Sequence, residues 1–444
     1  MSGSSVERAL ACEDALRGFD ARQVAKIERA SYVWNTLGGL VNAFQSVIML
    51  MVLMRVSTPA VAGVFTIAYA NANLFLNLGK YGMRSFQVSD VRQAYTFGAY
   101  LRSRVFTTAA MVVVSCAYLA FSAVTLDYSV DKVLVVLVMG LFKAVDAVED
   151  VYFGNFQQVG RLDVAGRLVT ARVASSIVVF GVSVVLSGDL LAPLAIATVY
   201  TALFLVAALA YARRRYDLPR GDRRIAPGSV ADLLKTCFPL FLAAFLLFYI
   251  GNAPKYAIDA CLGDVEQAYY GFIAMPVFIV GLLASFVYNP IITPMSRFWD
   301  EGRAGEFLRM FLVQVGVVIA ITAVCDLGAY LIGLPVLGWL YNADLSPYLV
   351  ELLVLVSGGG LYALTTLFTL GITIMRNQRQ LVWGYVLVAM AAMVVSNPVA
   401  SRWGIAGASW EYFVLMAALS LCFGIIFAVG FARASRKRGR HCSR

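Results

Sequence analysis

The chain has 444 residues, of which 60% are hydrophobic and 14% are charged, whereas soluble domains average about 45–50% and about 25%. The mean hydropathy is +0.77. A soluble domain cannot bury so much apolar surface. The composition therefore excludes a water-soluble enzyme, a disordered chain and a secreted disulfide scaffold, and it predicts a protein that lies in a lipid bilayer.

Cofactor chemistry is also disfavoured by the composition. The single histidine is His441, and the seven cysteines form no Cys-x-x-Cys pair. Neither a disulfide framework nor a zinc site is indicated, and a buried histidine base is excluded. No GxxxxGKS/T run for an ATP-driven motor occurs. We therefore expect no cofactor.

Twelve stretches are long and apolar enough to span the bilayer as helices, since each span needs about 20 residues. The first starts too late and is too long to be a signal-peptide core. The predicted fold is therefore an all-α polytopic membrane protein with twelve transmembrane helices. The predicted spans are 31–53, 58–79, 105–126, 132–153, 168–187, 190–211, 231–253, 267–293, 309–333, 347–375, 380–398 and 404–431.

The basic residues predict the orientation. Of the 36 lysines and arginines, the predicted outer segments hold only Arg55, Lys132, Lys255 and Arg402. Lys143 lies within the fourth span, and we assign all the others, with Arg104 and Arg172 among them, to the inner ends. This bias places both termini in the cytoplasm and the chain in the cytoplasmic (inner) membrane. The net charge of +10 then predicts contact with anionic membrane lipids and not with nucleic acid.

The longest basic loop, 213–224, follows the sixth span and divides the chain into two halves of six spans. Because six is even, the halves are predicted to be parallel repeats around a central cavity that opens alternately to each side. The predicted segments are a cytoplasmic N-terminal segment 1–30, an N-terminal six-helix bundle 31–212, a basic cytoplasmic linker 213–230, a C-terminal six-helix bundle 231–431 and a basic cytoplasmic tail 432–444.

Polar side chains follow one face of each of the first two spans. They are Asn35, Asn42 and Gln45 in the first span, and Tyr69, Asn73 and Asn77 in the second. The second face continues into Lys80 and Arg84 at its inner end. One interpretation is a hydrated cavity wall for sugar hydroxyls with a phosphate-binding mouth. The alternatives are amides that join helices by hydrogen bonds and cations that only anchor the inner end.

The fourth span holds four charged residues, Lys143, Asp146, Glu149 and Asp150. Charge at the bilayer centre costs about 2.5–3.5 kcal/mol per residue on insertion scales, and one base cannot neutralise three acids. Lys143, Asp146 and Asp150 therefore form a candidate proton- or sodium-responsive site. The alternative is a Lys143–Asp146 pair with the other two acids extending toward the inner surface.

Prolines and two further polar residues mark the seventh and eighth spans. Asn252 and Lys255 follow helical spacing, and Pro254 is predicted to interrupt the helix where it lines a cavity. Lys255 is a candidate lipid-phosphate ligand or an outer anchor. Pro276, the Asn289–Pro290 pair and Pro294 predict bends in the eighth span.

Two stretches carry a family resemblance. They are GKYGMRSFQVSD (79–90) with the following YTFGAYLRSR, and GNAPKYAIDACLGDVEQAYYGFIAMPVF (251–278) followed by NPIITP. The chain resembles the polysaccharide flippase family of the multidrug/oligosaccharidyl-lipid/polysaccharide exporter superfamily. The resemblance implies a V-shaped pair of six-helix bundles and transport of an undecaprenyl-diphosphate-linked oligosaccharide to the outer leaflet. It also implies a cationic cavity lined by spans one, two, seven and eight.

The sequence therefore predicts a transporter and not an enzyme, with a polyprenyl-diphosphate-linked oligosaccharide as substrate and with glycosyltransferases and a polymerase as possible partners. One alternative is a multidrug cation antiporter of the same superfamily, which is expected to have an acidic cavity. The other is a membrane-bound polysaccharide polymerase or ligase, which is expected to have a large outer catalytic loop.

Overall fold

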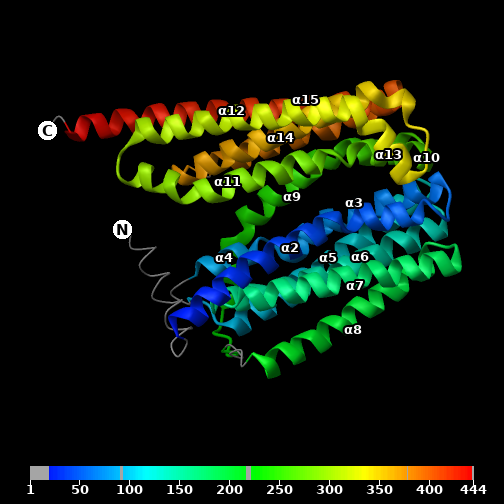
Figure 1. Cartoon of the computed structure of the whole chain (residues 1–444), viewed down its shortest axis with the longest axis horizontal. Helices are drawn as coiled ribbons and strands as arrows, with labels where there is room; N and C mark the ends of the chain where they lie inside the picture. The colour runs from blue at the N-terminus through cyan, green and yellow to red at the C-terminus, as the bar shows by residue number, and fades with distance from the viewer. Residues whose placement is uncertain (1–19, 91–93, 217–221, 378, 443–444) are drawn as a thin grey trace. The chain divides into compact units, whose positions relative to one another are not determined.

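The computed structural model describes residues 20–90, 94–216, 222–377 and 379–442, and within these ranges all regular structure is helical (Figure 1). Of the predicted N-terminal segment, linker and tail, residues 1–19, 217–221 and 443–444 lie outside the described ranges. The helices are α2 (Ala21–Leu53), α3 (Pro59–Lys80), α4 (Met83–Ser89), α5 (Phe97–Thr125), α6 (Val130–Gln158), α7 (Leu162–Ser187), α8 (Leu191–Arg215), α9 (Ser229–Cys261), α10 (Asp264–Ala274), α11 (Val277–Asp300), α12 (Ala304–Gly328), α13 (Leu334–Tyr341), α14 (Leu349–Ile374) and α15 (Arg379–Cys442).

The all-helical membrane fold is confirmed. Ten helices of the described residues are long and apolar enough to cross a membrane, and the chain is a multi-pass membrane protein. The charges of α6 keep it out of that set, although its 29 residues are long enough to span a bilayer. The 64-residue α15 contains two of the predicted spans. Together these helices account for the twelve predicted spans.

Helix α15 reverses direction at Gly404, whose φ of 58° and ψ of −141° are non-helical. Two contacts show that its arms run antiparallel: the rings of Tyr385 and Phe423 lie 4.8 Å apart, and the Ser396 hydroxyl donates to Glu411. Figure 1 shows the helix running out and back. This backbone conformation is essentially restricted to glycine, because a Cβ there clashes with the residue's own backbone.

Replacing Gly404 by alanine is expected to destabilise the protein by about 1–3 kcal/mol, the usual cost of a strained backbone conformation. No heavy atom lies within 4 Å of a Cβ built at Gly404, so the cost comes from the positive φ and not from a clash with another residue. Thermal unfolding of the purified protein in detergent measures it. The matched control is Gly316→Ala in α12, which also has open space around its Cβ but no positive φ. Equal melting temperatures for the two variants would contradict the prediction.

The proline predictions have mixed outcomes. The bend at Pro276 is confirmed, since α10 ends at Ala274 and α11 begins at Val277. The predicted interruption at Pro254 is wrong: α9 continues from Ser229 to Cys261. Pro290 and Pro294 also lie inside the continuous α11. A transmembrane helix tolerates proline because neighbouring groups can satisfy the carbonyl that its missing N–H leaves free.

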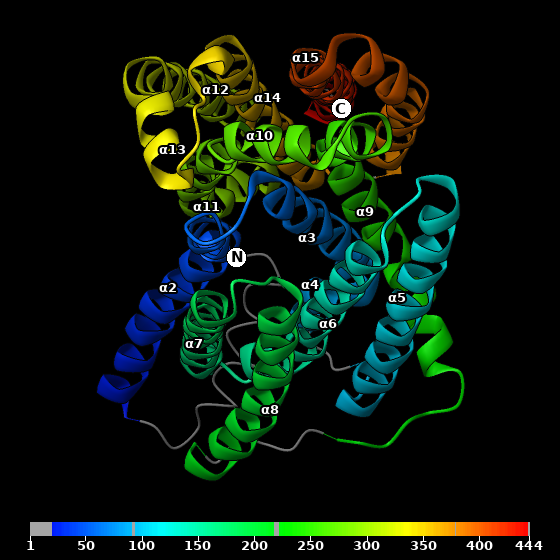
Figure 2. The ribbon, with the colours of Figure 1, turned by 90° about the vertical axis from the view of Figure 1, so that its right-hand side faces the viewer.

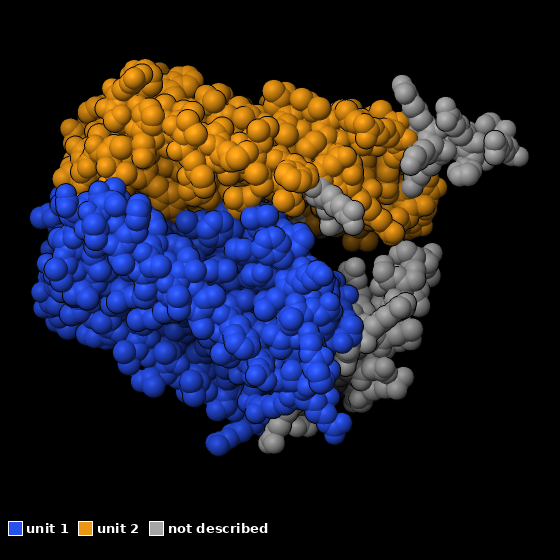
Figure 3. Space-filling view, turned by 180° about the vertical axis from the view of Figure 1, so that it is seen from behind, with its two compact units in different colours: residues 1–245 blue, residues 246–444 orange. Residues whose placement is uncertain are grey.

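The chain divides into two compact units, residues 1–245 and 246–444, which Figure 3 colours separately. The division falls within α9, beyond the predicted linker 213–230. In unit 1, α2 packs against α7, α3 against α5 and α6, and α8 against α6 and α7 (Figure 2). In unit 2, α14 packs against α11, α12 and α15. The rings of Phe311 and Phe427 stack with their centroids 4.1 Å apart and form part of the core of unit 2.

Helices α5 and α7 of unit 1 both begin more than one turn earlier than the sequence predicts. Helix α5 begins at Phe97, where the Thr96 hydroxyl caps it by accepting from the Ala99 N–H, and α7 begins at Leu162. The earlier start of α5 places Arg104 inside a helix, Arg172 already lay within its predicted span, and both side chains are buried. The sequence assigned both arginines to inner helix ends and did not predict their burial, which decides the electrostatics of α6.

Candidate functional site

Lys143 lies at the centre of a buried polar cluster between α2, α3 and α6. Its ammonium donates to Asp146 at 3.1 Å and to the Gln45 side-chain oxygen at 2.8 Å. The Tyr69 ring centroid lies 4.7 Å from Lys143 Nζ, a cation–π distance. The predicted Lys143–Asp146 pair is therefore confirmed.

Arg172 of α7 binds Asp146 and Glu149, two of the three buried acids of α6. Its guanidinium donates to both carboxylate oxygens of Glu149, at 2.7 and 2.6 Å, and to Asp146 at 2.7 Å. A further bond of 2.8 Å reaches the Thr201 hydroxyl of α8. The contact with Glu149 is bidentate, which is the strong form of an arginine–carboxylate pair. Arg172 thus joins α6, α7 and α8 through a single side chain.

Arg104 of α5 binds the third acid. Its guanidinium donates to Asp150 at 2.7 Å and to the carbonyl oxygen of Gly79 at 2.5 Å. Arg84 of α4 approaches the other oxygen of Asp150 only to 3.9 Å, keeps a third of its side chain exposed, and donates to the Gln157 side chain at 3.1 Å. Asp150 thus has one tight and one loose cationic partner.

These contacts correct the charge balance predicted for α6. In the described part of unit 1, Asp146, Glu149 and Asp150 face Lys143, Arg104 and Arg172. The expectation that the acids outnumber their bases was wrong, and so was the alternative in which Glu149 and Asp150 extend toward the surface, since both are buried. A balanced and hydrogen-bonded set is how buried charges are tolerated at all.

Replacing Arg172 by methionine is expected to destabilise the protein by about 3–5 kcal/mol, because it leaves buried carboxylates with too few cations. The free energy of unfolding, or the melting temperature in detergent, measures the loss. Arg214→Met at the exposed end of α8 is the control and should change stability little. An Arg172→Met protein as stable as this control would show that the network is not required for folding.

The predicted polar face of the second span is half-buried and bonds to its own helix. The Asn73 amide donates to the Tyr69 carbonyl at 2.8 Å, and the Asn77 amide to the Asn73 carbonyl at 2.9 Å. Asn252 in unit 2 does the same with the Phe248 carbonyl at 3.0 Å. Each of these bonds stays within one helix, whereas the alternative interpretation of the second span has Asn73 and Asn77 join helices.

The predicted face of the first span is divided by the structure. Asn35 and Asn42 are exposed, whereas Gln45 is buried, accepts from Lys143 and donates to the Ser176 hydroxyl at 3.4 Å. The expectation that Gln45 lines a wet cavity together with Asn35 and Asn42 is therefore wrong. The alternative, an amide that joins helices, is confirmed for Gln45, which bonds to α6 and α7. Its carbonyl oxygen is needed to satisfy the buried ammonium.

Lys80 and Lys255 are the remaining predicted phosphate ligands. Both are half-buried, and neither makes an ion pair within 4 Å with any residue that the structure describes. Lys80 ends α3 in unit 1 and Lys255 lies in α9 in unit 2. The sequence predicts for each lysine either a phosphate ligand or an anchor at the end of its span, and both interpretations stay predictions.

Two intramembrane acids of unit 2 were missed by the sequence analysis. Asp326 of α12 accepts a 2.9 Å bond from Ser357 of α14, and Glu411 accepts from Ser396. In each carboxyl group the other oxygen is buried without a hydrogen-bond partner among the residues that the structure describes. Each acid stands alone within an apolar run, a pattern that marks functional candidates in membrane helices.

A family model described as "Polysaccharide biosynthesis protein" matches residues 29–299, more than half of the chain. The chain belongs to this family. No curated protein matches it at a significant level.

Solved structures show the same fold. The inward closed conformation of the lipid II flippase MurJ matches with a TM-score of 0.68 and 10% identity, over 90% of both chains. An inward-facing multidrug resistance MATE family transporter of the MOP superfamily matches with a TM-score of 0.64 and 12% identity, over 92% of this chain and 99% of that one. A MOP superfamily transporter from Pyrococcus furiosus, titled for a binding pocket of reverse polarity, matches with a TM-score of 0.53, 12% identity and 98% coverage of both chains. The chain therefore has the fold of these MOP superfamily transporters.

Proposed function

We propose that the protein is a flippase that moves a polyprenyl-diphosphate-linked oligosaccharide from the inner to the outer leaflet by alternating access. The carrier would be undecaprenyl diphosphate, and the pathway a cell-surface polysaccharide such as lipopolysaccharide, with glycosyltransferases and a polymerase as partners. Membership of a polysaccharide biosynthesis family and a fold shared with a lipid II flippase support a lipid-linked cargo.

The observation that carries the proposal is the pair of available cations at one end of α3 and α4. Lys80 has no carboxylate within 4 Å in the described residues, and Arg84 has only the loose contact of 3.9 Å with Asp150. A guanidinium and an ammonium are the usual protein ligands of phosphate. Asn77 and Asn73 precede Lys80 on the same helix face, so polar groups suited to sugar hydroxyls adjoin the cations.

The rival functions fit less well. A cation antiporter is expected to have an acidic cavity, whereas the buried α6 acids of unit 1 are bound by Arg104 and Arg172. Asp326 and Glu411 of unit 2 are the acids that such a rival would have to use. A polymerase or ligase needs a large outer loop, and the turns on the predicted outer side are short, as between Leu53 and Pro59 or Thr125 and Val130. We therefore propose that the chain carries out transport and not catalysis.

Removing the phosphate ligands is expected to reduce export. A lost charge-assisted hydrogen bond costs about 1.5–3 kcal/mol, which corresponds to about a 10- to 100-fold loss of affinity. Surface polysaccharide should therefore fall sharply when a flippase-null strain carries Lys80→Ala, Arg84→Ala or Lys255→Ala. Arg214→Ala is the matched control at an exposed helix end, and its strain should export normally. Wild-type polysaccharide from both the Arg84→Ala and the Lys255→Ala strains would reject the phosphate role.

For ion coupling we propose Asp150 as the responsive group, with Asp146 and Lys143 as its structural anchor. Asp146 is held by two close cations, whereas Asp150 shares its charge between Arg104 at 2.7 Å and Arg84 at 3.9 Å. Protonation or cation binding at Asp150 would weaken its attraction for the more exposed Arg84. Arg84 would then be free for the diphosphate.

Asp150→Asn should therefore abolish the response of transport to an imposed proton or sodium gradient without abolishing substrate binding. Proteoliposomes with a fluorescent lipid-linked oligosaccharide measure both quantities. Asp189→Asn, in the exposed turn before α8, is the control and should respond like wild type. A full gradient response in Asp150→Asn would place the coupling elsewhere.

A further inference from the structure

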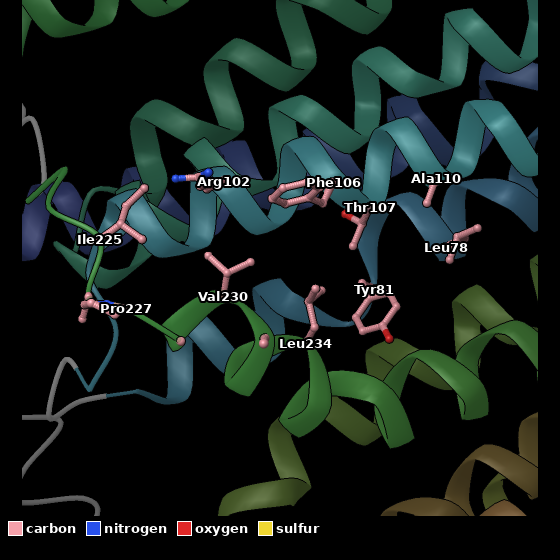
Figure 4. A pocket seen from close by; sticks show the side chains of 13 residues that line it. Leu78, Tyr81, Arg102, Phe106, Thr107, Ala110, Ile225, Pro227, Val230 and Leu234 are labelled. Carbon is pink, nitrogen blue, oxygen red and sulfur yellow. The ribbon is translucent and has the colours of Figure 1, made fainter.

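Unit 1 contains a groove that is separate from the polar side chains Asn35, Asn42, Asn73 and Asn77 of α2 and α3. It lies between α5, the end of α3, and the start of α9 with the segment 225–228 before it (Figure 4). Its volume is about 770 Å³, within the ~300–1,000 Å³ range of sites that bury a small ligand. Its apolar lining residues include Leu78, Phe106, Ala110, Ile225, Val230 and Leu234.

The groove is charged at one end and apolar at the other. Figure 4 shows Arg102 near Ile225 and Pro227, with Leu78 and Ala110 at the opposite end. Arg102 is exposed and makes no ion pair with any residue in the described ranges. This distribution matches an amphiphile that has an anionic head and an apolar tail.

Fixed contacts hold the walls of the groove in place. The Gly98 N–H donates to the Asp222 carbonyl at 2.8 Å, and Tyr95 donates from its hydroxyl to Asp232 at 2.5 Å. The rings of Tyr81 and Phe241 stack 4.7 Å apart. The segment before α9 and the first turns of α9 are thus bound to the ends of α3 and α5, so the groove is preformed.

The groove opens beside a surface of α5 that is suited to lipid. Val105, Phe106, Val113 and Phe121 are each more than half exposed, as expected of side chains that face acyl chains. The basic residues place the start of α5 at the cytoplasmic head-group level. Anionic lipids of that leaflet attract exposed arginines by about 1 kcal/mol each.

We propose that this groove binds an anionic phospholipid of the surrounding membrane, with the phosphate on Arg102 and an acyl chain along Phe106, Ala110 and Leu234. The oligosaccharide substrate is a poorer occupant, because the lining offers few polar groups for sugar hydroxyls. The Thr107 hydroxyl, for example, already donates to the Gly79 carbonyl at 2.8 Å. The bound lipid would hold the segment before α9 against α5, and ligands of the folded state stabilise it by mass action.

The proposal is tested on the full-length protein in detergent, with phosphatidylglycerol and phosphatidylcholine as probes. Native mass spectrometry should show phosphatidylglycerol retained by the wild type and about tenfold weaker retention by Arg102→Ala, which lacks the phosphate ligand. Ala110→Trp, which fills the apolar end, should lose retention through a different part of the groove. Arg214→Ala is the matched surface control and should bind like wild type.

Thermal unfolding supplies the second measurement. Added phosphatidylglycerol should raise the melting temperature of the wild type and the control, but not that of Arg102→Ala or Ala110→Trp. Equal retention and equal stabilisation in all four proteins, or no preference over phosphatidylcholine, would overturn the proposal. Displacement of the phospholipid by a polyprenyl phosphate at equal concentration would also overturn it, because the groove would then belong to the carrier lipid.

Discussion

The arrangement of unit 1 depends on the high cost of an unpaired charge in lipid. Helix α6 carries three acids and one lysine into the membrane-spanning region, and a single uncompensated charge there opposes insertion. Arg104 from α5 and Arg172 from α7 complete the balance. The helices that surround α6 are therefore joined by charge as well as by packing. Unlike van der Waals packing, these bonds have direction, so they fix which helix faces which.

The same balance separates structural cations from available ones. Lys143, Arg104 and Arg172 are buried, and each binds at least one carboxylate of α6, so none of them is available to a substrate. Lys80 and Arg84 lie at the end of the same region but are only half-buried. A phosphate can therefore reach them without breaking the core. Asp150 contacts both groups, because it binds Arg104 tightly and Arg84 loosely. A change of charge at Asp150 would therefore change the electrostatic potential at the proposed phosphate site.

The two units treat intramembrane acids differently. In unit 1, the acids of α6 are bound by cations. In unit 2, Asp326 and Glu411 each accept from a serine hydroxyl, and each has one buried oxygen without a partner in the described residues. Hydroxyl donors stabilise a carboxylate less than a cation does. A change of protonation or charge would therefore act on cation-bound acids in unit 1 and on serine-bound acids in unit 2.

The sequence by itself determined the membrane class and the number of spans, and it offered the Lys143–Asp146 pair as one of two interpretations. Apolar length and helical spacing are properties of single segments, so they can be read without a fold. It did not predict the burial of Arg104 and Arg172, because an arginine near a span end looks the same whether it faces head groups or a buried acid. It also left open whether Gln45 lines a wet cavity or joins helices, and it predicted an interruption of α9 at Pro254. Only the tertiary structure decided these points. Charge pairing between helices depends on which faces meet, and that is set by packing among segments far apart in the chain.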